Sequence, residues 1–244
     1  MSISLTMKKL IKSVINSLGW DLQRLNAASN PNAQLLAALD YVQANIVFDV
    51  GANIGQFTQG LRSAGFAGKI ISFDPLTAAH AQLSKSAKND SEWLVHPRVA
   101  LGDHEGEIEI NIAGNSVSSS VLPMLDEHSS AAIDSAYVAS ERTPLVCLDT
   151  VAEQYLTEDS RPFIKIDTQG FEWQVLDGAT ETLKRAQGVL LELSLVQLYG
   201  GQRLWREIIE RMEKEGFTLW AIQKGFTDPR TGRSLQVDGI FLRQ

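Results

Sequence analysis

The sequence has little that would suit it to the outside of a cell or to nucleic acid. Its 244 residues include one cysteine, Cys147, so the chain cannot form an internal disulfide and suits a reducing compartment. It has no run of 18 apolar residues, so no segment is predicted to cross a membrane. Acidic residues outnumber basic ones by 29 to 22, and the net charge of −7 argues against a nucleic-acid backbone as partner. These features predict a cytoplasmic protein.

Signals for secretion and for metal binding are also missing. Lys12, Ser13 and Asn16 interrupt the apolar stretch that follows Met7, so this stretch does not fit a signal peptide. The chain has four histidines, and none of them fits the pattern of a metal site. The sequence therefore predicts no metal ligands.

Residues 45–58 carry the strongest pattern in the chain. A short apolar run ends at Asp49, as expected of a buried parallel strand, and a turn with Gly51 and Gly55 follows it. Apolar residues then recur at helical spacing. A strand, a glycine turn and a helix N-terminus together favour a nucleotide-like ligand. Asn53 stands where the dinucleotide fingerprint G-x-G-x-x-G has its second glycine, which disfavours a dinucleotide.

A second acid supports a ligand that contains ribose. Residues 69–74 have the pattern of another strand, which ends at Asp74, 23 positions after Gly51. A carboxylate at this place can accept hydrogen bonds from both ribose hydroxyls. The pattern D-x-G-x-N-x-G followed by this acid fits S-adenosylmethionine (SAM) better than NAD.

Strands and helices alternate along most of the chain, which predicts a parallel, doubly wound α/β sheet. Strands are expected near residues 46–50, 69–73, 93–100, 162–167 and 188–193, and helices near 54–64, 76–88, 172–185 and 202–215. Residues 107–112 alternate in polarity and predict an extra strand. Residues 217–222 and 237–242 predict an antiparallel hairpin, because the loop between them has no room for a crossover helix. Residues 116–140 lack periodicity, so we expect a mobile loop or lid there.

The chain is predicted to consist of an N-terminal helical segment, residues 1–45, packed on a single domain, residues 46–244. A first helix over residues 5–18 would have one apolar face, with Met7, Ile11, Val14 and Leu18, and would carry Lys8, Lys9 and Lys12 off that face. This helix either contacts an anionic membrane or a partner, or packs over the open side of the domain, which we prefer. A second helix begins at Pro31, with Asn30 as its N-cap.

Several segments resemble the FkbM family of SAM-dependent methyltransferases. They are residues 48–58, 73–75, 99–103, 148–150, 164–172, 175–179 and 225–232, together with the strand that holds Asp238. The most diagnostic is Lys-Ile-Asp-Thr-Gln-Gly-Phe-Glu at residues 165–172, where many family members have an acid in place of Gln169. The resemblance runs from about residue 45 to the end of the sequence.

The resemblance implies a Rossmann-like class I methyltransferase fold, with a mostly parallel seven-stranded sheet, helices on both faces and an antiparallel C-terminal hairpin. It implies transfer of a methyl group from SAM to a hydroxyl of a sugar, glycoconjugate or natural product, with S-adenosylhomocysteine as the second product. The residues that would hold the methionine and ribose parts of SAM are Asp49, Gly51, Asn53, Gly55 and Asp74, while Arg98 and Ala100 would border the adenine.

Lys165, Asp167 and Glu192 are the candidates for the chemistry. Lys165 lies in a central strand, where a buried ammonium requires a partner, and Asp49 or Glu192 could provide it. Asp167 and Glu192 end adjacent strands roughly 4.8 Å apart, so we expect them to act together at the reacting hydroxyl. Three arrangements of these two carboxylates are open: they share a proton, they hold a divalent metal, or one of them pairs with Lys165. The metal is not favoured because only two oxygen ligands are visible, and Asp167 is the preferred base.

Two alternative functions stay open at this point. One is an NAD-dependent oxidoreductase on a Rossmann-like fold, and the other is an inactive methyltransferase-like binding module. For a methyltransferase, the expected partner is a small-molecule or glycan acceptor rather than a nucleic acid. Whether the chain forms a homo-oligomer is left open. The sequence does not identify the acceptor, because its pocket is expected to come from the N-terminal helices, residues 113–142 and residues 224–236.

Overall fold

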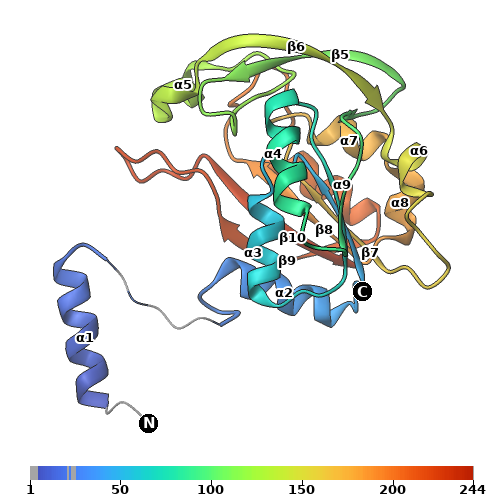
Figure 1. Ribbon diagram of the computed structural model, residues 1–244. Coiled ribbons are helices and arrows are strands. Elements are labelled where there is room, and N and C mark those ends of the chain that lie inside the picture. Colours follow the sequence, from blue (N-terminus) through green and yellow to red (C-terminus); the bar gives the residue numbers. More distant parts are fainter. Residues whose placement is uncertain (1–4, 21, 23–25, 244) are drawn as a thin grey trace.

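The computed structural model describes residues 5–20, 22 and 26–243, and a seven-stranded sheet forms its centre (Figure 1). The strands lie in the order β3-β2-β1-β7-β8-β10-β9. They are β1 (Ile46–Val50), β2 (Lys69–Phe73), β3 (Trp93–Val95), β7 (Pro162–Ile166), β8 (Gly188–Ser194), β9 (Phe217–Lys224) and β10 (Gln236–Arg243). The β8–β10 and β10–β9 pairs are antiparallel, and the other pairs of neighbouring strands in this sheet are parallel. This sheet and its C-terminal hairpin confirm the predicted fold class.

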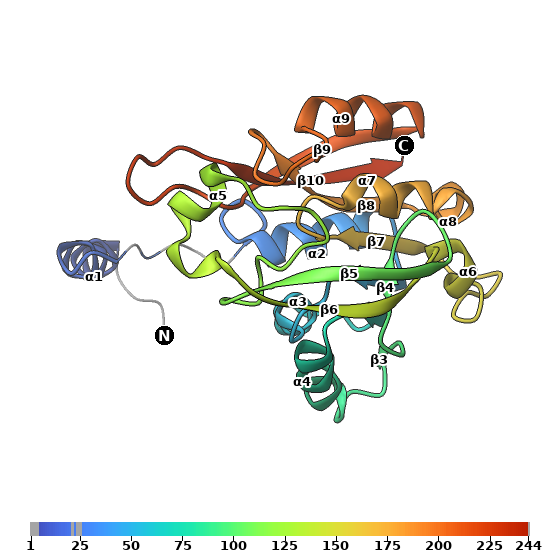
Figure 2. The same ribbon diagram turned by 90° about the horizontal axis from the view of Figure 1, so that it is seen from above.

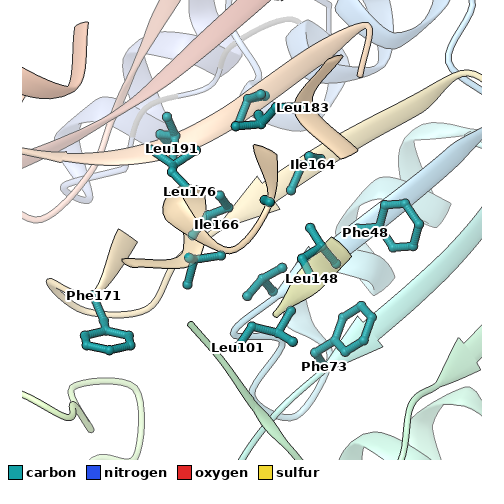
Figure 3. Packing of buried hydrophobic residues seen from close by; sticks show 14 of the residues in the cluster. Phe48, Phe73, Leu101, Leu148, Ile164, Ile166, Phe171, Leu176, Leu183 and Leu191 are labelled. Carbon is teal, nitrogen blue, oxygen red and sulfur yellow. The ribbon is translucent and has the colours of Figure 1, made fainter. Parts of the chain in front are cut away.

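Helices cover both faces of the sheet, as a doubly wound fold requires. The helices are α2 (Pro31–Tyr41), α3 (Gln56–Ala64), α4 (Thr77–Ala87), α6 (Leu148–Ala152), α7 (Glu172–Asp177), α8 (Thr180–Arg185) and α9 (Trp205–Lys214). One apolar core joins the sheet to α6, α7, α8 and α9, and a second joins its other face to α2, α3 and α4. Figure 3 shows the first core, where Leu148, Leu176 and Leu183 of the helices lie against Phe48 and Ile164 of the strands. Every residue of β1 and β7 is buried, which fits strands covered on both sides.

A smaller sheet with the order β4-β6-β5 runs along the top of the molecule in Figure 1. It contains β4 (Ala100–Leu101), β5 (Gly106–Ala113) and β6 (Tyr137–Val146), and β5 is the extra strand that the sequence predicts. The prediction of one strand over residues 93–100 is wrong, because β3 ends at Val95 and β4 belongs to this second sheet. Pro97 lies between them, and a proline has no N–H with which to continue a ladder.

The helix predicted over residues 172–185 is divided into α7 and α8 at Gly178. The backbone at Gly178 packs directly against the backbone of Gly102, the residue after β4. A Cβ on Gly178 would lie 1.8 Å from the carbonyl oxygen of Gly102. The carboxylate of Asp149 then begins a new helix, because it accepts hydrogen bonds from the amides of Glu181 (2.9 Å) and Thr182 (2.7 Å). Packing and capping thus override the helical periodicity.

Residues 116–140, predicted as a mobile loop or lid, form a structured wall. The segment contains α5 (Asp126–Ala131), the short 3₁₀ helix η1 (Ile133–Ser135) and the start of β6. Isolated bridges join Asn111 to Ser120 and Met124 to Tyr199. The sequence lacks periodicity here because these contacts connect single residues rather than a regular face.

The N-terminal segment divides into one helix that packs on the sheet and one that does not. In α2, the side chain of Asn30 accepts a hydrogen bond from the amide of Ala33 at 2.9 Å, which confirms the predicted cap, and Leu35 and Leu39 are buried. The first helix, α1 (Leu5–Ser17), lies apart from the sheet in both views (Figures 1 and 2), and its apolar side chains Met7, Leu10, Ile11 and Val14 are exposed. It therefore departs from the prediction that residues 1–45 pack on the domain. None of the described helices has the length and apolar character needed to span a membrane.

Candidate active site

A cavity of about 230 Å³ lies at the carboxyl ends of β1, β2 and β7. Ligands of parallel α/β sheets bind at this edge. The second sheet and residues 116–121 provide its opposite wall. The lining includes Asn53, Asp74, Ala100, Lys165, Asp167 and Gln169, with Phe73, Leu76, Val99 and Leu101 as an apolar part.

The glycine turn is shaped by close packing of backbone on backbone. Gly51 has a φ of +74°, and a Cβ on it would lie 1.8 Å from the carbonyl oxygen of Asp167. The amides of Gly51 and Ala52 both donate to the carbonyl of Phe73, which ties the end of β1 to the end of β2. Gly55 also has a positive φ, but it packs against Trp93 and does not line the cavity. Of the two glycines, only Gly51 fits the predicted place beside a ligand.

Asp74 and Asn53 form one end of the cavity, as the sequence predicts. The Asp74 carboxylate accepts hydrogen bonds from the amides of Asn53 (2.8 Å) and Leu76 (3.0 Å). Burial raises the pKa of Asp74 to about 7, although these two amides oppose the shift. The side-chain Oδ1 of Asn53 is buried and has no hydrogen-bond partner among the described residues. A bound ligand that carries hydroxyl or ammonium donors would satisfy both groups.

Asp49 does not take the predicted role, because its carboxylate is fully buried and lies outside the cavity lining. It accepts hydrogen bonds from Thr58 and Ser72, both at 3.1 Å, and its Oδ1 lies 3.1 Å from the ammonium of Lys165. Lys165 faces Asp49 across the β1–β7 pair, so their side chains share one face of the sheet. The structure therefore confirms Asp49 as the partner of Lys165 and makes it a structural residue.

Lys165 connects the buried ion pair to the cavity. Its ammonium donates to the carbonyls of Val50 (3.2 Å) and Gly51 (2.8 Å), and it lies 3.7 Å from the carboxylate of Asp167. Burial alone would lower the pKa of Lys165, but the charges of Asp49 and Asp167 raise it above its usual value. Lys165 is therefore a fixed cation that holds the glycine turn and Asp167, and it is not available as a base.

Arg98 also departs from its predicted place beside an adenine. It lies outside the cavity lining, and its guanidinium donates to the carbonyl of Pro75 at 2.8 Å and contacts Glu141 at 3.3 Å. Ala100 does line the cavity, and its place beside an adenine stays a prediction. Arg98 thus holds the chain that follows Asp74 and acts on the site only through it.

At the other end of the cavity, Asp167 is joined to Glu192 through Gln169, a residue for which the sequence analysis predicts no role. The amide nitrogen of Gln169 donates to Asp167 at 2.7 Å and to the two oxygens of Glu192 at 3.1 and 3.2 Å. Its amide oxygen accepts from the hydroxyl of Tyr199 at 2.9 Å. Gln169 thereby uses both donor hydrogens and links the two acids, and a proton shared between them stays a prediction.

The acids around Gln169 differ in their access to the cavity, and burial raises the pKa of two of them. Burial, followed by the charges of Asp167, Glu172 and Asp238, raises the pKa of Glu192 well above its usual value. Burial also raises the pKa of Asp238, which faces Glu192 across the β8–β10 pair, to about 7. Asp167 lines the cavity with a side chain that is 44% exposed, whereas Glu192 does not line it. Asp167 is therefore the acid of this group that a ligand in the cavity can reach.

Tyr199 and His128 support this end from behind. Tyr199 is fully buried, its hydroxyl lies 3.5 Å from His128, and the two rings are 5.2 Å apart. Burial lowers the pKa of His128. The positive φ of Gln169, +54°, turns its side chain toward this group. No local pattern in the sequence signals such a turn at a non-glycine residue.

Within the described part of the chain, no group of three or more His, Cys, Asp or Glu side chains is arranged to hold a metal ion. The residues do fit SAM. Asp74 and the unpartnered Oδ1 of Asn53 offer acceptors for ribose hydroxyls or an ammonium, and the apolar wall beside Ala100 suits an adenine ring.

A model of the methyltransferase FkbM domain matches residues 49–219, which is more than half of the chain. Among curated proteins, none matches the sequence. One similar solved structure is magnesium protoporphyrin IX methyltransferase from Synechocystis, with 11% identity, a TM-score of 0.47 and full coverage of both chains. Another is 1,6-didemethyltoxoflavin-N1-methyltransferase from Burkholderia thailandensis, with 13% identity, a TM-score of 0.45 and coverage of 100% of this chain and 92% of that one. A third is an rRNA methylase from Streptococcus thermophilus, with 13% identity, a TM-score of 0.43 and coverage of 88% and 97%.

Proposed function

The chain belongs to the FkbM methyltransferase family, and from that premise we propose that it uses SAM to methylate a hydroxyl on a sugar, glycoconjugate or natural product. Bound SAM supplies a methyl group on a positively charged sulfur, which is open to attack by a nucleophile. Asp74 and Asn53 would hold the ribose and methionine parts, and Val99, Ala100 and Leu101 would border the adenine. Family membership also disfavours the NAD-dependent oxidoreductase that the sequence left open.

Asp167 carries the proposal for the acceptor side. Its carboxylate is exposed to the cavity, and the ammonium of Lys165 (3.7 Å) and the amide of Gln169 (2.7 Å) fix its position. A hydroxyl placed beside it would donate a hydrogen bond and then give up its proton to Asp167 as its oxygen attacks. The alignment of the two substrates supplies much of the acceleration. Because the Asp167 carboxylate is already held in place, little conformational entropy is lost when it binds the acceptor hydroxyl.

The cavity lining favours an acceptor with several hydroxyls. Ser116, Ser119 and Ser120 line the cavity from the wall formed by the second sheet and residues 116–121, and Ser116 lies beside Asn53. Hydroxyls and carboxylates together provide both donors and acceptors, which sugars and hydroxylated natural products require. The net charge of −7 disfavours a nucleic-acid substrate.

The test is transfer of a labelled methyl group from SAM into fractions of a cell extract and into hydroxylated acceptors. We expect label in a sugar-containing or hydroxylated small molecule, and Asp167→Asn should lower turnover by about 10²–10⁴-fold without weakening SAM binding. Asp103→Asn, which changes a surface acid outside the cavity lining, is the matched control.

Four outcomes would contradict parts of this proposal. Label mainly in RNA or in protein side chains would refute the acceptor class. Full turnover by Asp167→Asn would remove this residue as the base. SAM binding without transfer to any fraction would favour the inactive binding module, while activity lost in EDTA and restored by Mg²⁺ would assign Asp167 to a metal.

A further inference from the structure

The first helix, α1, presents apolar side chains to solvent along one side. Leu10, Val14 and Leu18 follow one another at a spacing of four residues and are 64%, 53% and 71% exposed. Isolated exposed apolar residues are ordinary, but a row of them on one helix marks a contact surface. The active site described above makes no use of this helix.

The end of α1 fixes an aromatic residue beside this row. Gly19, with a φ of +82°, donates its amide to the carbonyl of Asn16, and the amide of Trp20 donates to the carbonyl of Ile15. This pair of hydrogen bonds is a Schellman motif, which ends a helix in a defined geometry. Trp20 is 74% exposed, and Leu22 beyond it is 48% exposed. The apolar row therefore continues past the helix into an exposed indole.

Charge separates this segment from the rest of the chain. Residues 1–20 contain Lys8, Lys9 and Lys12 and no acid, so they carry +3, whereas the net charge of −7 leaves −10 for residues 21–244. A basic helix attracts an anionic surface, and the acidic remainder is repelled by the same surface. The two effects together would orient the protein, with α1 toward the surface.

We propose that α1 is an interfacial helix that lies on an anionic lipid bilayer. Its 13 residues span about 20 Å, which is too short to cross a hydrocarbon core of about 30 Å. Aliphatic side chains on one face, lysines off that face and a tryptophan at the end are the composition of helices that lie in the membrane interface. A protein partner would have to bury the indole and also pair the lysines with acidic side chains. In an anionic bilayer, the acyl chains bury the indole and the headgroups pair with the lysines.

Membrane binding would also bear on the substrate, and this consequence rests on the proposed function. A bilayer-bound enzyme meets acceptors whose hydroxylated headgroup is carried by a lipid at a high local concentration. Binding to the bilayer does not depend on SAM or on the acceptor, so it can be measured on the free protein. A failure of membrane binding is therefore distinguishable from a failure of methyl transfer.

The experiment is co-sedimentation of the full chain with vesicles of neutral phosphatidylcholine, or of phosphatidylcholine with 30% phosphatidylglycerol. We expect binding to the anionic vesicles, and Leu10→Asp with Val14→Asp should reduce the partition coefficient by more than tenfold. Lys9→Glu with Lys12→Glu should remove most of the preference for anionic lipid, by about fivefold or more for each lysine. Val138→Asp is the matched control, because Val138 is 69% exposed on β6, away from α1.

Trp20 gives a readout on the same helix. Its fluorescence should shift to the blue in anionic vesicles, and Trp20→Phe should abolish the shift while the other four of the five tryptophans remain. Equal sedimentation of the wild type and the α1 variants would overturn the proposal. So would a wild-type dimer that the α1 variants convert to a monomer while vesicle binding is unchanged, because α1 would then bind a second copy of the chain.

Discussion

The two ends of the cavity hold their carboxylates by different means. At the Asp74 end, the backbone amides of Asn53 and Leu76 donate to the carboxylate. At the Asp167 end, the contacts come from side chains, the amide of Gln169 and the ammonium of Lys165. Backbone donors depend on the path of the chain, whereas side-chain donors can be changed one substitution at a time. The first end can therefore stay constant while the second is adapted to different acceptors.

The two ends also differ in the distance along the chain over which they are assembled. The Asp74 end needs the glycine turn after β1 and the first residues after β2. The Asp167 end combines β7, β8 and β10 with Tyr199 and the wall of residues 116–121. This difference predicts where a mutation acts. Changes in the glycine turn should disturb folding and SAM binding together, and changes around Gln169 should act on catalysis alone.

The largest effect should follow from a methyl group on Gly51. Gly51→Ala would put a Cβ 1.8 Å from the carbonyl oxygen of Asp167 at a φ of +74°. Because neither backbone can yield without opening the β1–β7 pair, we expect the free energy of unfolding to fall by about 4 kcal/mol or more. Denaturant unfolding monitored by circular dichroism measures this loss.

Gly232→Ala is the matched control for that substitution. Gly232 has a φ of +72°, and a Cβ on it would meet no atom within 4 Å. Only the strain of the left-handed conformation should remain, about 1–2 kcal/mol. Equal losses in the two variants would mean that strain alone determines the cost, and the close approach of Gly51 to β7 would then carry no stability.

The next effect concerns Asp74, the acid that the backbone holds. Asp74→Ala should weaken SAM binding by about 1.5–3 kcal/mol, the contribution of hydrogen bonds to a charged acceptor. The pKa of Asp74 is raised to about 7, so in the free protein the carboxyl gains a proton as the pH falls below 7 and loses acceptor capacity. SAM affinity of the wild type should therefore fall by up to about tenfold for each pH unit below 7, measured by calorimetry.

The variant itself serves as the control for this pH dependence. Asp74→Ala has no carboxyl at this place, so its weaker SAM binding should change little between pH 6 and 8. A wild-type affinity that is flat over the same range would assign the titration to another group. An unchanged affinity in Asp74→Ala would remove Asp74 from the SAM site.

The sequence predicts the Asp74 end well because its signals are local. Gly51, Asn53 and Asp74 follow strand ends within one βαβ unit, and the structure places all three on the cavity. Asp49 was assigned to the ligand only because it lies in the same motif. Alternation along β1 turns its side chain to the α3 face, where Thr58 and Lys165 satisfy it.

The Asp167 end could be predicted only in part. Parallel strand ends meet at one sheet edge, so the neighbourhood of Asp167 and Glu192 follows from the strand assignment. The link through Gln169 depends on a positive φ at a non-glycine residue, and the approach of Asp238 depends on the register of the antiparallel β10. Both are set by tertiary packing. Residues 116–140 were predicted to be mobile for the same reason, because single contacts rather than a periodic face hold them.

The smallest effect should come from a charge on Gln169, and it tests whether this residue only supports the fold. Gln169→Glu removes the amide that donates to Asp167 and Glu192 and adds a carboxylate to a group of acids. Repulsion then raises the pKa of the acid that must be charged to accept the proton. We expect the acidic limb of the profile of kcat/KM against pH to move up by about one unit, equivalent to about 1.4 kcal/mol, while SAM binding is unchanged.

Gln59→Glu is the control, because it adds the same charge on the exposed side of α3 and should leave the profile in place. A purely structural Gln169 would instead lower the unfolding temperature of Gln169→Glu and leave the limb where it is, and that result would mean that the amide does not tune Asp167.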